Sequence, residues 1–229
     1  MSRTSFKFQT ENSANFKTQL LLWAQQFKTA IWLDSNNYSQ KHSNFDAVLA
    51  VDAFSEINTS YYKAFQKLKK FQTKTNDFIF GYLSYDLKNN VENLQSNNFD
   101  GLHFPDLYFF QPKKLFFIKG DIVEIKYLNE FYSEIETDLK KIKLATSENK
   151  KTENEVKIKL RIHKDEYFNK LNSVLNHIHR GDIYEANFCQ EFYSENSIIN
   201  PAETYQHLNK ISKPPFATFL KIDDKFLLS

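Results

Sequence analysis

The sequence predicts an α+β protein built on an antiparallel sheet. Stretches with strand periodicity and stretches with helix periodicity are mixed along the chain, without the regular alternation that a parallel sheet requires. Two pairs of apolar runs, 115–118 with 122–127 and 216–222 with 225–229, are separated by short polar turns and indicate β-hairpins. Aromatic residues make up 16% of the 229 residues, so a sizeable core can form.

The first half of the chain is predicted to hold further strands and three helices. Apolar residues alternate or run together in strands at 6–8, 30–34, 47–51 and 77–86. Helical spacing of apolar residues predicts helices at 16–27, 61–68 and 131–142. Gly81 lies inside the strand at 77–86, which is typical of a bulge or of a close approach by another backbone.

A polar segment divides the chain. Residues 147–155 are charged and lack large apolar side chains, so we predict a first domain at 1–145, a linker at 146–155 and a second domain at 156–229. The second domain is predicted to open with a strand at 156–162 and a helix that ends before Gly181, which favours the left-handed conformation. Asn200, Pro201 and Glu203 then indicate the start of another helix.

Composition excludes several kinds of site. The formal charge is only +2, so neither a nucleic-acid partner nor a membrane surface is expected, and Lys67, Lys69 and Lys70 are interpreted as a solvated helix face. Cys189 is the single cysteine, which rules out an internal disulfide and a cysteine metal site. The 4 glycines argue against a glycine-cradled nucleotide site. No long apolar run or signal core is present, so we expect a reduced, cytoplasmic protein.

The most specific motif lies near the C-terminus. It consists of GDIYEANFCQEF at 181–192 followed by KPPFATFLKI at 213–222. Each residue alone also fits a plain structural role, such as a helix stop for Gly181 or a core ring for Tyr184 and Phe216. The ordered set resembles the start of the chorismate-binding domain shared by aminodeoxychorismate synthase component I and anthranilate synthase component I, and is carried by Gly181, Asp182, Tyr184, Glu185, Asn187, Gln190, Pro215 and Phe216.

Three earlier segments agree with this resemblance. LDSNNY at 33–38 with HSNFD at 42–46, FGYLSYDL at 80–87 and FPDLYFFQPKKLFFI at 104–118 resemble family segments in the same order. The resemblance covers most of the chain and is thin from 129 to 159. It implies the fold of anthranilate synthase component I: an antiparallel β-sandwich core with flanking helices, incomplete at the C-terminus of this chain.

The family resemblance implies amination of chorismate. Aminodeoxychorismate synthase, which serves para-aminobenzoate and folate biosynthesis, is favoured by the segments at 81–87 and 104–106. Anthranilate synthase of tryptophan biosynthesis is the alternative, and a non-catalytic amino-acid-binding or subunit-interaction module is the alternative of another class. The resemblance also implies chorismate as substrate, Mg²⁺ as cofactor and a glutamine amidotransferase subunit that supplies ammonia.

Catalytic residues are not assigned within these 229 residues. The Ser-Pro-Glu segment and the later lysine and glutamate motifs of the family would follow residue 229, so we assign no catalytic residue and no metal ligand. The last predicted strand is still apolar where the sequence stops. We therefore expect a truncated chain that is inactive by itself.

The resemblance does place an amino-acid pocket in this chain. In the family this pocket holds tryptophan, and an aromatic wall with nearby hydroxyls suits an indole and an ammonium. Three positions depart from the family pattern. Glu185 replaces a common Gln, Asp34 replaces a common Glu of anthranilate synthases, and Ala217 replaces a common Ser or Met. The expected pocket residues are Ser35, His42, Ser43, Asn44, Phe45, Pro215, Phe216 and Ala217.

Overall fold

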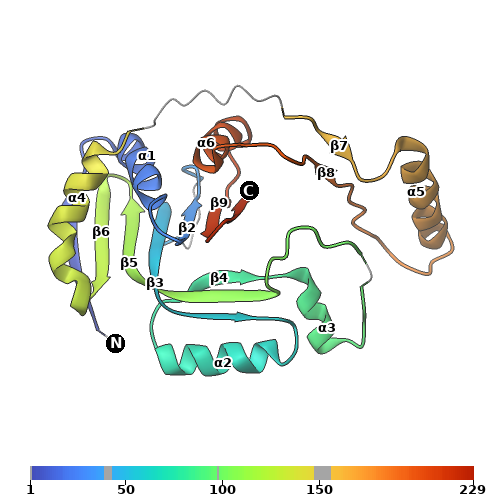
Figure 1. The fold of residues 1–229 in the computed structure, drawn as a ribbon, viewed down its shortest axis with the longest axis horizontal. Helices are drawn as coiled ribbons and strands as arrows, with labels where there is room; N and C mark the ends of the chain where they lie inside the picture. Colours follow the sequence, from blue (N-terminus) through green and yellow to red (C-terminus); the bar gives the residue numbers. More distant parts are fainter. Residues whose placement is uncertain (1, 39–42, 97, 147–155) are drawn as a thin grey trace. The chain divides into compact units, whose positions relative to one another are not determined.

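The computed structural model describes residues 2–38, 43–96, 98–146 and 156–229 (Figure 1). Its contacts divide the chain into two compact units, one formed by Met1–Glu148 with Pro201–Ser229 and the other by Asn149–Asn200. This division differs from the one drawn on the sequence, in which 156–229 form one domain. The difference arises because the strand at 217–222 hydrogen-bonds to the strand at 29–34, in the first half of the chain.

An eight-stranded antiparallel sheet forms the centre of the first unit. Its order is β1-β6-β5-β3-β2-β9-β10, and β4 pairs with one end of β5. All its strand pairs are antiparallel. The strands are β1 (Arg3–Gln9), β2 (Thr29–Asp34), β3 (Ala47–Thr59), β4 (Phe80–Leu83), β5 (Leu107–Lys119), β6 (Ile122–Leu128), β9 (Ala217–Ile222) and β10 (Lys225–Leu228).

Helices supply the rest of the first unit. Three of them, α1, α4 and α6, contribute side chains to one core together with alternate residues of the central strands, such as Trp32, Leu49 and Phe116. The intervening strand residues, such as Ile31 and Leu115, belong to a second core, as expected for a pleated strand. The helices are α1 (Ser13–Ala24), α2 (Ala64–Thr75), α3 (Lys88–Val91), α4 (Ile135–Leu144) and α6 (Pro201–Ser212), with 3₁₀ turns η1 (Tyr85–Leu87) and η2 (Asn129–Glu134).

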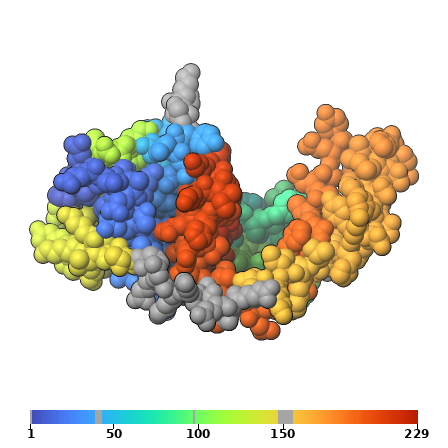
Figure 2. All heavy atoms as spheres, turned by 90° about the horizontal axis from the view of Figure 1, so that it is seen from above, coloured from blue at the N-terminus to red at the C-terminus, as the bar shows by residue number. Residues whose placement is uncertain are grey.

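The predicted α+β class and its large antiparallel sheet are confirmed. Both predicted hairpins are present, as β5–β6 and β9–β10. The family resemblance led us to expect a β-sandwich. The described residues show one large sheet of it, because all the strands of the first unit join a single hydrogen-bonded sheet. Figure 2 shows the consequence at the surface, where residues after 200, in red, pack against N-terminal residues in blue.

Gly81 confirms the expected close approach of two backbones. It pairs with Phe109 in the β4–β5 ladder. A Cβ atom at this position would lie 1.9 Å from the Tyr108 carbonyl oxygen and 2.6 Å from the Phe109 Cα atom, so only glycine fits. The strand predicted at 77–86 is shorter than expected, because the chain leaves the ladder after Leu83 and coils into η1.

The second unit holds one helix and a small pair of strands. α5 (Lys164–His179) lies between β7 (Lys159–Leu160) and β8 (Phe192–Tyr193), which pair antiparallel. The strand predicted at 156–162 is thus reduced to two residues, since β8 offers only two partners. Gly181 has φ +79° and its N–H donates to the Ile178 carbonyl at 3.0 Å, which confirms the left-handed helix end.

Two surface expectations can be compared with the described residues. Lys67, Lys69 and Lys70 are exposed on α2, as the sequence predicts. Among the helices that the structure describes, none has the length and apolar character needed to cross a membrane. The predicted linker at 146–155 lies, except for its first residue, outside the described residues.

Candidate functional site

The residues predicted to form the amino-acid pocket converge on one cavity of about 350 Å³. Strand pairing explains the convergence. Asp34, the last residue of β2, pairs with Ala47 at the start of β3 and with Ala217 at the start of β9. The segments that flank these strand ends, 43–46 and 215–216, are therefore brought to the same edge of the sheet.

Seven of the eight predicted pocket residues line this cavity, and His42 lies outside the described residues. The seven are Ser35, Ser43, Asn44, Phe45, Pro215, Phe216 and Ala217. The structure adds Leu33, Asp34, Asp46 and Thr218, which the motif comparison did not select. Leu33, Asp34 and Asp46 lie in the segments 33–38 and 42–46 that resemble the family, and Thr218 directly follows the selected Ala217.

One polar group of the cavity has no hydrogen-bond partner among the described residues. The Ser35 hydroxyl is buried and unpaired. Its own backbone is fixed, because the Ser35 N–H donates to the Asp46 carbonyl at 2.8 Å. The Ser43 hydroxyl, by contrast, donates to the carbonyl of Phe45. A buried unpaired hydroxyl costs about 1–3 kcal/mol, so a ligand that offers a hydrogen bond would offset that cost.

Both carboxylates beside the cavity are already engaged. Asp34 is 8% exposed and accepts from Lys17 Nζ at 3.0 and 3.2 Å and from the Asn36 N–H at 2.9 Å. Burial alone would raise the pKa of Asp46, but hydrogen bonds from the Gly120 N–H and Lys119 outweigh it and lower the pKa of that carboxyl. Asp46 therefore remains ionised at neutral pH.

Hydrogen bonds of Asn36 link the two walls of the cavity, the segment after β2 and the segment before β9. Its Nδ2 donates to Asn209 Oδ1 on α6 and to the Pro214 carbonyl, each at 2.7 Å, while Asn209 Nδ2 donates back to Asn36 Oδ1 at 3.0 Å. Asn36 has φ +49°, a left-handed conformation that asparagine tolerates better than most residues. Asn36 directly follows Ser35 and Pro214 directly precedes Pro215, so this pair fixes how far apart the walls lie.

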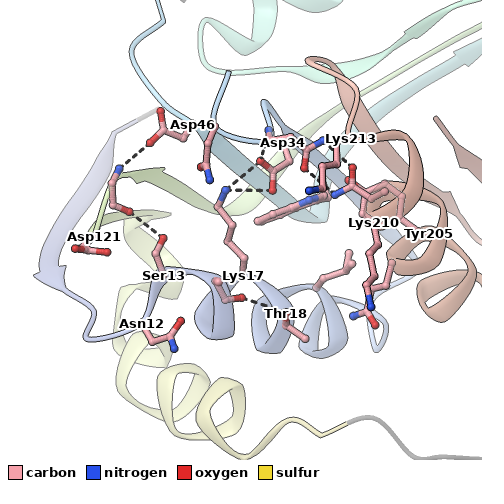
Figure 3. Close-up of a pocket in the computed structure, with 18 of the residues that line it drawn as sticks. Asn12, Ser13, Lys17, Thr18, Asp34, Asp46, Asp121, Tyr205, Lys210 and Lys213 are labelled. Atoms are coloured by element: carbon pink, nitrogen blue, oxygen red, sulfur yellow. Dashed lines mark hydrogen bonds and ion pairs between the residues drawn. The ribbon is translucent and has the colours of Figure 1, made fainter. Parts of the chain in front are cut away.

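A larger cleft of about 860 Å³ lies next to this cavity and shares Asp34 and Asp46 with it. Its walls are α1, the end of β2, the β5–β6 turn and α6 (Figure 3). Trp32, Leu21 and Tyr205, all nearly buried, supply apolar surface. The ion pair between Lys17 and Asp34 lies in the middle of the cleft. Sequence comparison had not indicated this cleft.

Most motif residues of the second unit occupy exposed positions after the end of α5, and Gln190 is half-buried. The Asp182 carboxylate contacts His177 Nδ1 at 2.7 Å and accepts from Arg180, so it pairs with side chains as well as ending the helix. Tyr184 is 92% exposed and is therefore not a core ring in this unit. Gln190 Nε2 donates to the Ile162 carbonyl at 3.0 Å.

The Mg²⁺ implied by the family resemblance does not fit the described side chains. Within residues 2–38, 43–96, 98–146 and 156–229 there is no group of three or more His, Cys, Asp or Glu residues able to hold a metal ion. We therefore assign no described residue to the ion.

Comparison with known proteins decides the family. The family model described as chorismate binding enzyme matches residues 19–229. The chain belongs to the chorismate-binding enzyme family. An anthranilate synthase component I-like protein from a Synechocystis species is 28% identical over 148 residues, which are 61% of this chain and 29% of that protein.

One solved structure of an anthranilate synthase component supports the fold. Anthranilate synthase component I from Streptococcus pneumoniae matches with a TM-score of 0.58 and 15% identity, over 80% of this chain and 48% of that one. The menaquinone-specific isochorismate synthase from Escherichia coli gives a TM-score of 0.48 and 11% identity, over 100% of this chain and 50% of that one. The chain thus spans less than a third of the curated relative and about half of each solved structure.

Proposed function

We propose that this chain is the N-terminal part of an aminodeoxychorismate synthase component I, which aminates chorismate at C4 for para-aminobenzoate synthesis. The ordered motif at 181–192 and 213–222 supports a chorismate-aminating enzyme, and the segments at 81–87 and 104–106 favour the aminodeoxychorismate branch. The nucleophile and the ligands of Mg²⁺ are then supplied by residues outside this chain, and a glutamine amidotransferase subunit supplies ammonia.

Within that enzyme, this chain contributes the amino-acid cavity. The observation that carries this proposal is the unpaired Ser35 hydroxyl in the wall of a cavity whose two sides come from opposite ends of the sequence. The cavity volume of about 350 Å³ lies within the range of small-molecule sites, about 300–1,000 Å³.

The chemistry of the walls suits an aromatic amino acid. Leu33, Phe45 and Pro215 offer apolar surface to a ring, and Phe216 is 75% exposed at the rim, where it can close over a ligand. The Phe45 ring is itself supported by Phe117, with their centroids 5.7 Å apart. Ser35 and Ser43 supply hydroxyls for the polar end of the ligand. L-Tryptophan is the amino acid that the family resemblance implies.

Calorimetric titration with L-tryptophan tests the cavity. We expect weak binding, because Asp34 and Ala217 depart from the family pattern. Ser35→Ala should weaken binding roughly fivefold, the equivalent of about 1 kcal/mol for one hydrogen bond. The same variant should not lower the melting temperature, since the hydroxyl has no partner in the free protein.

The exposed Ser133 provides a matched control. Ser133→Ala should leave L-tryptophan binding unchanged. Equal affinity of wild type and Ser35→Ala would place the ligand elsewhere and remove the case for this cavity.

Disruption of the coding sequence in its own organism tests the enzymatic function. A growth requirement that para-aminobenzoate alone relieves supports the aminodeoxychorismate branch. A requirement relieved by tryptophan or anthranilate overturns that branch in favour of anthranilate synthase. Normal growth without either supplement, with no second family gene present, overturns the enzymatic proposal and leaves a non-catalytic module.

A further inference from the structure

The cleft between α1 and α6 has an uneven distribution of charge. Its middle is neutralised, because Lys17 pairs with Asp34 at 3.0 Å. Asp121 lies with Asn12 and Ser13 at one end, whereas Lys210 and Lys213 lie with Tyr205 at the other (Figure 3). The cleft is therefore bipolar, with an acidic end and a basic end.

The charges at both ends are available to a ligand. No ion pair within the described part of the chain engages Glu11 or Asp121 at the acidic end, or Lys210 or Lys213 at the basic end. Asp46, which also lines the cleft, differs from them because it already pairs with Lys119 at 3.0 Å. The unpaired charges are thus two of each sign, one pair at either end.

The α6 wall adds two buried donors that lack acceptors. Tyr205 is 2% exposed, and neither its hydroxyl proton nor Nε2 of the adjacent Gln206 has an acceptor in the described residues. Burial, reinforced by the charge of Asp34, raises the pKa of Tyr205 against the opposing effect of a hydrogen bond from the Trp32 side chain, so its hydroxyl stays protonated and able to donate. Leaving such donors unpaired is unfavourable, and an acceptor at this wall would relieve it.

We propose that this cleft is a second binding site, for a short peptide with free termini. Its carboxylate lies at the basic end, which Lys210, Lys213, Tyr205 and Gln206 line, and its ammonium lies at the acidic end, near Glu11 and Asp121. A free α-amino acid carries both charges on one carbon and reaches only one end. A peptide separates them, and the cleft of about 860 Å³ has room for its backbone between them.

Chemically blocked peptides test the requirement for both charges. The 229-residue chain is titrated with triglycine, N-acetyl-triglycine, triglycinamide and glycine, and binding is followed by calorimetry and by backbone amide shifts. We expect triglycine to bind and to shift amides of α1 and α6, and each blocked form to bind at least about tenfold more weakly. Equal binding of blocked and free forms overturns the proposal, as does no binding up to roughly 10 mM triglycine.

Substitutions then locate the site. Lys210→Gln combined with Lys213→Gln should weaken triglycine binding at least about tenfold, while binding of triglycinamide, which lacks the carboxylate, should hardly change. Lys69→Gln combined with Lys70→Gln removes the same charge from the exposed face of α2 and should leave binding unchanged. Equal losses in both double variants would show a general charge effect and no site in the cleft.

Two further variants separate this site from its surroundings. Tyr205→Phe keeps the ring and should weaken triglycine binding, because it removes a hydroxyl donor that has no acceptor in the free protein. Ser35→Ala affects the neighbouring amino-acid cavity only and should leave triglycine binding unchanged. A loss of triglycine binding in Ser35→Ala would place the peptide in that cavity and overturn the assignment to the cleft.

Discussion

Asp77 shows how a single buried charge is held in this protein. It is ion-paired with Arg3, and the two side chains are 6% and 7% exposed. Arg3 Nε donates to Oδ1 at 2.8 Å and Gln111 Nε2 donates to Oδ2 at 2.8 Å. Burial alone would raise the pKa of Asp77, but these hydrogen bonds outweigh it and hold the pKa below its ordinary value of 3.8.

The lowered pKa of Asp77 predicts a pH-dependent contribution to stability. Because the folded pKa lies below the unfolded one, the contribution is complete above the unfolded pKa and is lost as pH falls through the folded pKa. Asp77→Asn should therefore lower the free energy of unfolding at pH 7, and the difference from wild type should shrink below about pH 4. Urea unfolding across this range measures it.

An exposed aspartate serves as the control for this experiment. Asp224 is 88% exposed, and Asp224→Asn should change stability little at any pH. A difference between wild type and Asp77→Asn that stays constant from pH 7 to pH 3 would contradict the assignment of the effect to ionised Asp77.

Residues are predictable from sequence where a local motif contains them. Ser35, Phe45 and Pro215 lie in short segments that resemble the family, and they do line one cavity. Pairings between distant positions were not predictable. Arg3 and Asp77 are 74 positions apart, and their side chains meet because β1, β6, β5 and β4, which follows Asp77, join one sheet. No sequence pattern around Arg3 or around Asp77 predicts this ion pair.

At the scale of elements, a second cluster of charged side chains joins α4 to β5 and β6. Lys114 of β5 is 3% exposed, and its Nζ lies 2.5 Å from Asp138 and 2.6 Å from Glu134. The Tyr127 hydroxyl of β6 donates to the same Asp138 carboxylate at 2.9 Å. The cluster joins α4 to two strands, and the hydrogen bonds to Asp138 and Glu134 raise the pKa of Lys114 against the opposing effect of burial.

Removal of one member of this cluster should be costly. Lys114→Met leaves Asp138 buried without its cation, and breaking a buried pair in this way costs about 3–5 kcal/mol of unfolding free energy. The double variant Lys114→Met with Asp138→Leu replaces both charges by apolar groups and should recover most of the loss. Chemical denaturation of the three proteins measures both effects.

Lys119 of the same strand offers the comparison for Lys114. Its side chain is 56% exposed in its pair with Asp46, so Lys119→Met should cost only about 0–1 kcal/mol. If Lys114→Met cost no more than Lys119→Met, the buried pair would not be the element that fixes α4 on the sheet.

Whole elements were predictable where periodicity is sustained, and their ends were not. The helices at 13–24, 135–144 and 164–179 follow from apolar spacing. The strand predicted at 77–86 spans only 80–83, since its extent depends on where β5 offers a partner. Local propensity contains no information about that partner.

At the scale of the molecule, the order of strands could not be read from the sequence. β2 and β9 are neighbours although almost the whole chain separates them, and this pairing transfers residues 201–229 to the first unit. A polar segment indicated a boundary, but composition does not reveal that the chain returns to its first sheet after the boundary. Periodicity predicts only the α+β class. The family resemblance adds the more specific expectation of an anthranilate synthase component I-like fold.

The exchange of hydrogen bonds between Asn36 and Asn209 has an evolutionary consequence. The two residues are 173 positions apart, yet each amide satisfies the other. A single replacement leaves one amide without its partner, whereas a paired replacement can restore a match. Among natural relatives these two positions should therefore vary together, while the exposed residues of α6 drift independently. Substitutions at position 36, in the turn after β2, and at position 209, on α6, would then be inherited together.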